Sequence, residues 1–500
     1  MPTTISLDPG NRVAPVNRRS FGSFVEHLGR CVYTGLYEPG HPLADEHGFR
    51  RDVLDLVREL GVTTVRYPGG NFVSGYRWED GIGPAGQRPR RLDLAWHSTE
   101  PNSFGLDEFM AWTAAAGVEP MLAVNLGTRG LQEALDLVEY CNIAGGTALS
   151  DRRRANGAES PYNVRMWCLG NEMDGHWQIG GMTAREYGRL ASRTAKAMHM
   201  IDPTLQLVAC GSSGSGMPTF GEWEREVLTQ AYDDVDFISA HAYYCDDNDD
   251  LASFLASAVN MDYFIDSVIA TADHVRAAQK KTRRINISFD EWNVWYQRRA
   301  ESQPPTGDDW PVAPTLLEDR YSVADAVVVG NLLISLLRHS DRVQAACLAQ
   351  LVNVIAPIMT QPGGPAWKQT TFHPFALTAR YARGDVLDLA VRGDTVPTAG
   401  FGDVPAVDAV ATHRPESGDT ALFLVNRQID ANQEVTVDLR ANPGHHVSQA
   451  VVLANPDLTW TASPTDSTSV APQPLATPLT DGQLKVSLPP VSWAMIRLQS

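Results

Sequence analysis

Residues 167–177 read WCLGNEMDGHW and place Asn171 and Glu172 directly after a short apolar run. The run itself, residues 164–169, has the composition of a buried β-strand. Gly170 frees the backbone at the point where such a strand would end. The pattern therefore predicts that Glu172 lies at the C-terminal end of a strand.

A second stretch repeats this pattern. Residues 285–293 read INISFDEWN, so an apolar strand runs directly into Asp290 and Glu291. More than a hundred residues of alternating strand and helix signals separate Glu172 from Glu291. The two carboxyl groups can face each other only if their strands belong to one sheet or barrel. Glycoside hydrolysis needs such a pair.

The length, composition and net charge of the chain limit its possible architecture and partners. A (β/α)8 barrel with insertions takes roughly 250 to 400 residues, so a chain of 500 leaves room for a second domain. Hydrophobic residues make up 43% and charged residues 20%, which is typical of a globular protein with a large core. The formal charge of −18 repels phosphate backbones and anionic lipids. We therefore expect no nucleic-acid or membrane partner and a neutral substrate.

Targeting and cysteine signals are weak. The N-terminal residues contain no apolar segment of signal-peptide length, and no run elsewhere approaches about 18 apolar residues, so a cytoplasmic location is expected. The six cysteines are scattered without CxxC spacing, which favours free buried thiols over disulfides or zinc ligands.

Residues 18–383 are expected to form the barrel. Apolar strand patterns occur at 21–28, 63–70, 119–128, 164–169, 205–212, 236–244, 285–289 and 343–355. Helical patterns follow them at 50–60, 105–117, 131–146, 184–202, 222–232, 251–279, 321–340 and 372–383. Thr183 and Glu186 form a capping box for the fourth helix, which Pro203 ends. The polar, proline-rich loop 296–317 should lie over the active face.

Residues 384–500 show a different sequence pattern. Short alternating runs separated by turn residues replace the helical period, which predicts an antiparallel β-sandwich. A short strand within residues 1–17 has no partner nearby and should complete the sandwich. The expected fold class is thus α/β: a (β/α)8 TIM barrel with a C-terminal, jelly-roll-like antiparallel β-sandwich that the N-terminal strand completes.

Polar residues gather where the predicted barrel strands end, which is where barrel enzymes carry their active sites. Taken singly, each is more often a salt-bridge partner or loop anchor, and strand-end turn roles fit Asn71 and Asn171. A satisfied core histidine is nearly as good an interpretation of His241. Glu, Gln and Tyr are poor helix caps, however, so their joint placement favours one active site. The set comprises Glu26, Asn71, Asn125, Asn171, Glu172, His241, Tyr243, Glu291 and Gln350.

Six long segments together resemble the α-L-arabinofuranosidases of glycoside hydrolase family 51, over nearly the whole chain. They are residues 21–41, 64–84, 90–109, 167–175 (WCLGNEMDG), 239–243 (SAHAY) and 289–295 (FDEWNVW). The resemblance implies a retaining, exo-acting hydrolase without a cofactor. Its substrates would be arabinan, arabinoxylan or arabino-oligosaccharides. It also implies a homo-oligomer, often a hexamer.

The same resemblance implies roles at the two glutamates and their neighbours. Glu172 would be the general acid/base, and Glu291 the nucleophile whose negative charge helps its partner to hold a proton. Asn171 would bind the sugar 2-hydroxyl, and Tyr243 would donate to the nucleophile. His241 would sit beneath that tyrosine.

Further residues are expected to bind the sugar. Glu26, Asn71 and Gln350 match positions that hold furanose hydroxyls, and Trp96 and Trp295 offer aromatic faces. Trp310 lies on the loops of the same face, whereas Trp292 is better explained by core packing. The acidic run 246–250 lacks the spacing of a calcium loop and is read as a solvated charge run, so no metal is expected.

Two other functions remain open from the sequence. A β-glycosidase or endoglucanase could use the same barrel, because fold does not fix substrate. A noncatalytic carbohydrate-binding protein is the alternative from another class. The joint presence of both carboxyl groups and the sugar-binding set argues against it.

Overall fold

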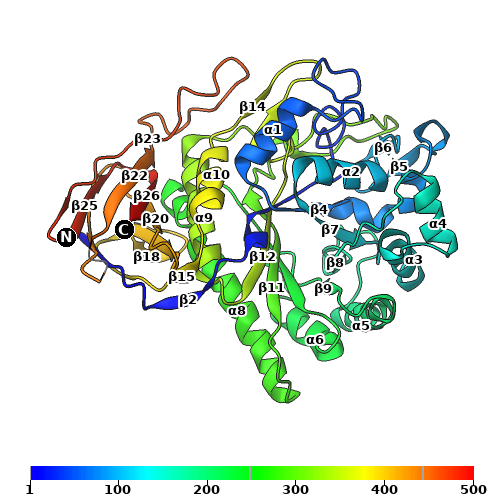
Figure 1. The fold of residues 1–500 in the computed structure, drawn as a ribbon, viewed down its shortest axis with the longest axis horizontal. Helices are drawn as coiled ribbons and strands as arrows, with labels where there is room; N and C mark the ends of the chain where they lie inside the picture. The colour runs from blue at the N-terminus through cyan, green and yellow to red at the C-terminus, as the bar shows by residue number, and fades with distance from the viewer. Residues whose placement is uncertain (1, 247–248, 442–443) are drawn as a thin grey trace.

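The computed structural model describes residues 2–246, 249–441 and 444–500, so residues 247–248 of the acidic run lie outside the described residues. Within this part of the chain, eight parallel strands close into a barrel in chain order (Figure 1). They are β3 (Gly22–Phe24), β4 (Thr64–Tyr67), β7 (Glu119–Val124), β8 (Met166–Leu169), β9 (Gln206–Ala209), β10 (Phe237–Tyr244), β11 (Asn286–Val294) and β12 (Val343–Leu348). The predicted barrel is confirmed.

Helices surround this barrel close to the predicted positions. They are α1 (Arg51–Leu60), α2 (Leu106–Ala116), α3 (Leu131–Asn142), α5 (Ala184–Ile201), α6 (Glu222–Ala231), α8 (Ser257–Ala278), α9 (Val323–Arg338) and α10 (Phe372–Tyr381). The capping box of Thr183 and Glu186 begins α5. The predicted helix 251–279 is interrupted at Ala256, which separates α7 (Leu251–Leu255) from α8. A further helix, α4 (Ala148–Ala155), was not expected.

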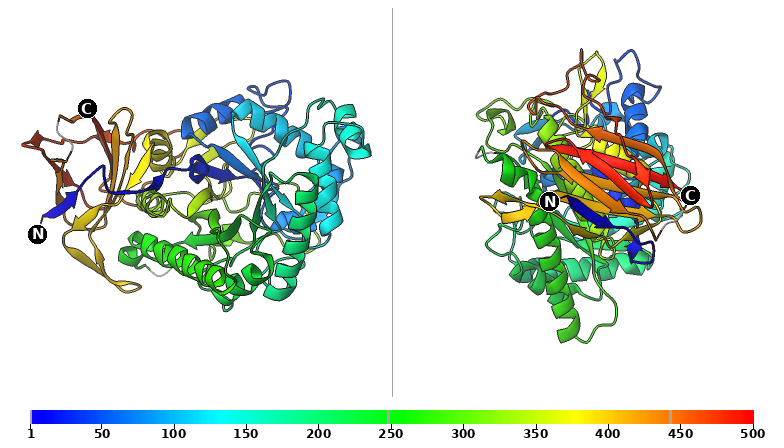
Figure 2. Two further views of the ribbon diagram at one scale, coloured as in Figure 1. Left: turned by 60° about the horizontal axis from the view of Figure 1, so that its bottom comes forward. Right: turned by 90° about the vertical axis from the view of Figure 1, so that its left-hand side faces the viewer.

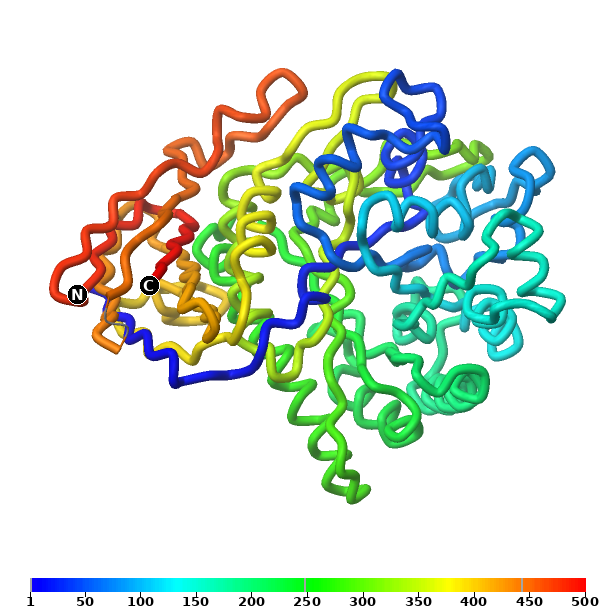
Figure 3. The backbone as a smooth tube through the Cα atoms, viewed as in Figure 1, coloured from blue at the N-terminus to red at the C-terminus, as the bar shows by residue number. Residues whose placement is uncertain are grey.

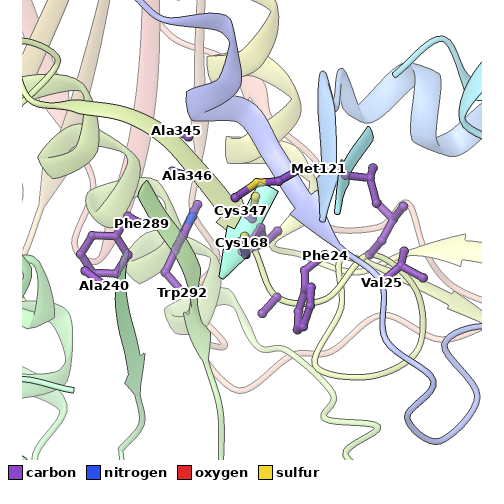
Figure 4. Close-up of a cluster of buried hydrophobic side chains, with 14 of the residues drawn as sticks. Phe24, Val25, Met121, Cys168, Ala240, Phe289, Trp292, Ala345, Ala346 and Cys347 are labelled. Carbon is purple, nitrogen blue, oxygen red and sulfur yellow. The ribbon is translucent and has the colours of Figure 1, made fainter. Parts of the chain in front are cut away.

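The barrel strands bury apolar side chains at their centre. Phe24, Met121, Cys168 and Cys347 come from four different strands and lie together (Figure 4). Each is at most 2% exposed, so the barrel interior below the active end is a packed core rather than a channel. All six cysteines lie in the described part of the chain and none forms a disulfide; five are buried, as predicted, and Cys245 is partly exposed. Among the described residues, no helix is both long and apolar enough to cross a membrane.

The sandwich consists of two sheets, counted over the described residues. The first has the order β16 (Ala390–Arg392), β1 (Thr3–Ser6), β21 (Gln433–Asp438), β25 (Gln483–Leu488) and β24 (Leu479–Thr480). The second has the order β2 (Arg12–Pro15), β15 (Asp385–Leu387), β19 (Val407–His413), β20 (Thr420–Asn426), β26 (Ser492–Gln499), β22 (His446–Leu453) and β23 (Gln473–Pro474).

The N-terminal strand completes the sandwich, as predicted. β1 lies between β16 and β21, and Ile5 joins the apolar core that the two sheets bury. Its pairing with β21 is parallel, which departs from the antiparallel pattern expected throughout. β2 adds to the edge of the second sheet, so both N-terminal strands lie on the C-terminal part of the chain (Figure 2).

The sandwich packs against α9 of the barrel. Asn331 of that helix donates to Asp408, which also accepts from Arg427 at 2.8 Å. Gly330 of α9 lies against the Trp493 ring on β26. The tube in Figure 3 follows the chain from α10 into the sandwich. The division into residues 1–17, 18–383 and 384–500 remains a prediction.

Three hairpins were not predicted, because each is too short to show a period. They pair β5 (Arg91–Asp93) with β6 (Ser98–Glu100), β13 (Ile358–Thr360) with β14 (Ala366–Lys368), and β17 (Thr395–Thr398) with β18 (Gly402–Pro405). The first of them matters for the site, because it carries Trp96 in its turn.

Replacing Gly330 by valine should lower the melting temperature. A Cβ added there would lie 2.2 Å from Trp493 Cδ1, and overpacking of a core contact costs about 1–3 kcal/mol. The matched control is Gly216→Val, where no atom lies within 4 Å of the added Cβ. Differential scanning calorimetry on both variants tests the expectation, and equal melting temperatures would contradict it.

Candidate active site

One pocket of about 420 Å³ opens at the C-terminal ends of the barrel strands. The structure brings eight of the residues singled out from the sequence to its wall: Glu26, Asn71, Trp96, Glu172, Tyr243, Glu291, Trp295 and Gln350. The predicted loop 296–317 contributes Gln297, Ser302, Gln303, Pro304 and Leu317. This loop holds only a short turn of 3-10 helix, Ala300–Ser302, and it covers the active face as expected.

The two glutamates meet in this pocket. Glu172 follows the end of β8 and Glu291 lies in β11, and β9 and β10 separate these two strands, so the glutamates reach the pocket from different parts of the barrel mouth. One oxygen of each lies within 4.8 Å of one oxygen of the other. Glu172 adopts a φ of +42°, a left-handed conformation that is costly for a residue other than glycine. Such strain is concentrated at functional sites.

His241 of β10 links the two glutamates from below. Its Nδ1 lies 2.9 Å from Glu172 Oε1 and 3.6 Å from Glu291 Oε2, and its Nε2 lies 2.9 Å from Asp290 Oδ1. Burial alone would lower the pKa of His241, but the charge of Glu291 and the hydrogen bonds to Asp290 and Glu172 raise it well above its ordinary value. The imidazole is therefore a cation at neutral pH and donates from both nitrogens.

Arg66 is the second buried cation, and the sequence reasoning missed it. Its Nη1 donates to Glu291 Oε1 at 2.7 Å, its Nη2 donates to Asn171 Oδ1 at 2.8 Å, and its Nε lies 3.7 Å from Asp290. Asn171 therefore holds the arginine and lies behind the pocket wall. The sequence did carry a signal: an arginine stands inside the short strand pattern TVRY, and a charged side chain buried in a strand needs a partner of opposite charge.

Asp290 was also missed as a functional residue, although it stands next to Glu291. Burial would raise the pKa of Asp290, but Arg66 and His241 outweigh it and hold the pKa below its usual range. Asp290 is thus ionised and fixes the orientation of both cations. An acidic residue next to the expected nucleophile was the sequence signal.

Glu172, His241 and Glu291 offer ligand atoms close enough together for a metal ion. Both nitrogens of His241 are already used as donors, however, and Arg66 occupies one oxygen of Glu291. Positive charge at this place is therefore supplied by the side chains themselves. The donor set fits a proton-transfer site better than a metal centre.

Tyr243 donates its hydroxyl hydrogen to Glu291 Oε2 at 2.7 Å. Its ring packs edge-on against Trp295, with ring centroids 5.0 Å apart. Burial and the neighbouring Glu172 raise the pKa of Glu291, whereas His241, Arg66 and the Tyr243 hydroxyl lower it. The net direction is upward from the ordinary value.

Glu26 forms a second polar group at the other side of the pocket. Phe72 N and Trp96 Nε1 donate to its Oε1 at 2.8 and 2.9 Å, and Gln350 Nε2 donates to its Oε2 at 3.1 Å. Burial raises the pKa of Glu26 to about 8 despite these hydrogen bonds. At neutral pH the carboxyl group therefore keeps its proton and can both donate to and accept from a sugar hydroxyl.

The two glycines before Asn71 make room for Glu26. A Cβ added at Gly69 would lie 2.4 Å from Glu26 Cγ, and one added at Gly70 would lie 3.0 Å from Glu26 Oε2. Gly69 also has a φ of +134°. The sequence PGGN is therefore needed so that the chain can pass closely over this carboxyl group.

Trp177 belongs to the site and was not singled out from the sequence. Its Nε1 donates to Glu172 Oε2 at 2.7 Å, although its side chain is 43% exposed. Asp174, from the same segment, accepts from Ser213 N and Oγ, and burial with the nearby Glu172 raises the pKa of Asp174 to about 6. The segment after β8 thus supplies a further carboxyl group close to Glu172.

Several expected residues lie away from the pocket wall. Asn125 instead accepts from Gly127 N and Thr128 N and shapes its own loop. Trp310 stacks on His97, with ring centroids 3.7 Å apart, and so joins the long loop to the hairpin that carries Trp96. Trp292 is fully buried, as the core interpretation predicted.

Sequence models of two arabinofuranosidase domains match the chain. The "Alpha-L-arabinofuranosidase 1 domain" matches residues 56–255, and the "Alpha-L-arabinofuranosidase C-terminal domain" matches residues 290–492. An intracellular exo-α-(1→5)-L-arabinofuranosidase from Streptomyces lividans is 57% identical over 98% of this chain and 74% of its own length. An exo-α-(1→6)-L-arabinofuranosidase from Bifidobacterium longum is 55% identical over 99% of this chain and 96% of its own.

Solved structures agree with these relatives. The family 51 α-L-arabinofuranosidase AbfB from Bifidobacterium longum superposes with a TM-score of 0.96 at 51% identity, covering 100% of both chains. The arabinose complex of an α-L-arabinofuranosidase from Thermotoga maritima gives a TM-score of 0.89 at 34% identity, again covering 100% of both chains.

Replacing Arg66 by methionine should destabilise the protein strongly. It removes one of the two cations that contact Glu291 and Asp290, and removing one partner of a buried ion pair costs about 3–5 kcal/mol. Chemical denaturation measures the loss. Arg66→Lys is the matched control, because it keeps the charge and should lose less; equal stability of the methionine variant and the unchanged protein would contradict this account.

Proposed function

This chain belongs to family 51 of the α-L-arabinofuranosidases, and we propose on that premise that it removes terminal α-L-arabinofuranosyl groups with retention of configuration. The enzyme acts from the non-reducing end by a double displacement. Glu291 is the nucleophile and Glu172 the general acid/base. Glu26, Asn71, Asn171, Tyr243, Gln350, Trp96 and Trp295 bind or position the sugar, and His241 supports both glutamates.

The separation of the two glutamates carries this proposal. Their nearest ligand oxygens lie within 4.8 Å of each other. Retaining enzymes hold their carboxyl groups about 5 to 5.5 Å apart, whereas inverting enzymes leave about 6.5 to 9.5 Å for a water molecule. The pocket therefore favours direct attack by a carboxylate.

The first step is attack of Glu291 on the anomeric carbon. The bond to the leaving oxygen breaks, and Glu172 gives that oxygen its proton. His241 holds Glu172 Oε1 from the buried side, whereas Trp177, which is 43% exposed, holds Oε2. The leaving oxygen therefore meets Glu172 at Oε2, in the place of the indole N–H.

The second step releases the sugar. Once the glycosyl–enzyme ester forms, Glu291 no longer carries a negative charge, and Glu172 takes a proton from water. The hydroxide attacks the anomeric carbon and the ester bond breaks, which restores Glu291. Arg66 and Tyr243 stay in place at the two oxygens of Glu291 and stabilise the carboxylate as it leaves.

Recognition of the terminal sugar falls to the side of the pocket opposite the acid/base. Glu26, Gln350 and Asn71 offer donors and acceptors for furanose hydroxyls, and Trp96 shields them from water. Two relatives of nearly equal identity carry names with different linkages, (1→5) and (1→6). We therefore place linkage preference outside this inner pocket, in the loop 296–317.

The proposed substrates are arabinan, arabinoxylan and the oligosaccharides derived from them. Several similar relatives are named intracellular, which supports action inside the cell on oligosaccharides short enough to be imported. Assembly into a homo-oligomer, with a hexamer as one form, belongs to the same proposal.

Glu291→Ala should lose nearly all hydrolysis of an aryl α-L-arabinofuranoside. Sodium azide should restore turnover, and the product should be the azide of inverted configuration, because the small anion enters from the vacated side. NMR of the product identifies its anomer. An aryl-glycoside panel run with the unchanged enzyme separates this activity from a β-glycosidase. Undiminished hydrolysis by the variant would refute the assignment of the nucleophile.

Tyr243→Phe should move the acidic limb of the kcat/KM profile to higher pH. The lost hydrogen bond lowers the pKa of Glu291, so its removal raises that pKa, and the ionised nucleophile is lost earlier as the pH falls. The comparison is a pH–rate profile of both proteins on one aryl substrate. Tyr244→Phe, on the next residue of β10, serves as a control with no contact to Glu291. An unchanged or acid-shifted limb would contradict the expectation.

A further inference from the structure

A second cavity, of about 230 Å³, lies where the end of α10 meets the sandwich. Four of its lining residues are arginines: Arg380, Arg383, Arg414 and Arg497. Only one carboxyl group, that of Asp419, lines it among the described residues. This concentration of positive charge stands out in a chain whose formal net charge is −18.

The four guanidinium groups are unequally paired. Arg497 lies 3.4 Å and Arg414 lies 3.9 Å from the same oxygen of Asp419, so one carboxylate serves both. The guanidinium of Arg383 donates only to the backbone carbonyls of Ala379 and Ala382, among the described residues. The single negative charge of Asp419 therefore does not neutralise the positive charges of the four arginines.

Arg380 is the most exposed member and has no acidic partner. Its guanidinium lies over the Tyr381 ring at 5.3 Å, and Arg497 lies over the same ring at 5.6 Å. The guanidinium of Arg380 makes no hydrogen bond or ion pair with any residue that the structure describes. The Tyr381 ring thus lies beneath two guanidinium groups at the cavity, and N–H groups of Arg380 remain available to a ligand.

Neighbouring positive charges add to the effect of burial on one member of the cluster, Arg383. Burial, and then the charges of Arg18 and Arg414, lower the pKa of Arg383 to about 10. A neighbouring negative charge would raise a guanidinium pKa, so none nearby is strong enough to offset the repulsion. An anion in the cavity would remove this cost.

We propose that this cavity is a binding site for a tetrahedral oxyanion, a phosphate group held between Arg380 and Arg383 on the barrel side and Arg414 and Arg497 on the sandwich side. Planar guanidinium groups donate two parallel hydrogen bonds to phosphate, and arginine is the residue most suited to such recognition. The occupant ties the turn between β19 and β20 to the end of α10.

The site is separate from the catalytic pocket. Arg18 precedes β3 and also donates to Ala379 O, at 3.1 Å, so the cavity lies toward the end of the barrel where the strands begin. The catalytic pocket lies where the strands end. Variants at the cavity should therefore leave hydrolysis of an aryl arabinofuranoside unchanged.

Isothermal titration calorimetry with inorganic phosphate tests the proposal, with sodium chloride at matched ionic strength as the reference. The unchanged protein should bind one phosphate per chain saturably, and Arg380→Gln should weaken binding about tenfold, because a hydrogen bond to a charged group is among the stronger ones. A second arm uses glucose 6-phosphate. Tighter binding than that of phosphate would identify a phosphorylated sugar as the occupant, and equal binding would identify the phosphate group alone.

Two further variants make the test decisive. Arg383→Gln should weaken phosphate binding at least as much as Arg380→Gln. Because the Arg380 side chain makes no hydrogen bond to any described residue, the Arg380→Gln variant loses none and keeps the fold. Arg193→Gln removes one exposed guanidinium from α5 and should bind as the unchanged protein does. Absence of saturable binding, or equal binding by all variants, would overturn the proposal.

Discussion

Burial of opposite charges in one small network governs the active end of the barrel. Glu172, Glu291 and Asp290 surround the two cations Arg66 and His241, and each of the five side chains is at most 9% exposed. With all three carboxyl groups ionised, the network carries three negative and two positive charges. One added proton makes it neutral, and a buried network favours neutrality. That single proton is what a general acid needs when its partner remains an ionised nucleophile.

The rest of the molecule is arranged so that this network keeps its geometry. β4, β10 and β11 supply four of the five members, and Glu172 follows the end of β8, so the closed barrel helps to fix the separation of the two glutamates. The loops supply Trp177, which donates to Glu172 Oε2, and residues of the segment 296–317, which line the pocket. None of the described sandwich residues lines the pocket wall, and the sandwich contacts the barrel at α9.

The sequence predicted the barrel, the sandwich and the positions of both glutamates because each depends on local patterns that repeat many times. Strand periodicity identifies a strand even where its predicted ends are wrong: β3 covers only Gly22–Phe24 of the expected 21–28. Arg66, Asp290 and Trp177 were not found, because their roles depend on which side chain they meet across the barrel. Asn125 was wrongly expected at the pocket for the same reason, because an amide at a strand end can hydrogen-bond to its own loop as well as to a ligand. The helical period gives no sign of the break at Ala256, whose side chain packs with Val396, Val404 and Ala406.

The strand at the start of the chain has a consequence for how this protein is made. β1 pairs with β21, whose first residue follows the last residue of β1 by more than 400 positions. At a synthesis rate of about 5–20 residues per second, Ile5 waits on the order of 20 to 90 seconds on the ribosome before its neighbours emerge. During this interval the strand is an apolar segment without a sheet, while the barrel behind it can already close. The last step of maturation is then the return of the first residues to a sheet translated at the other end.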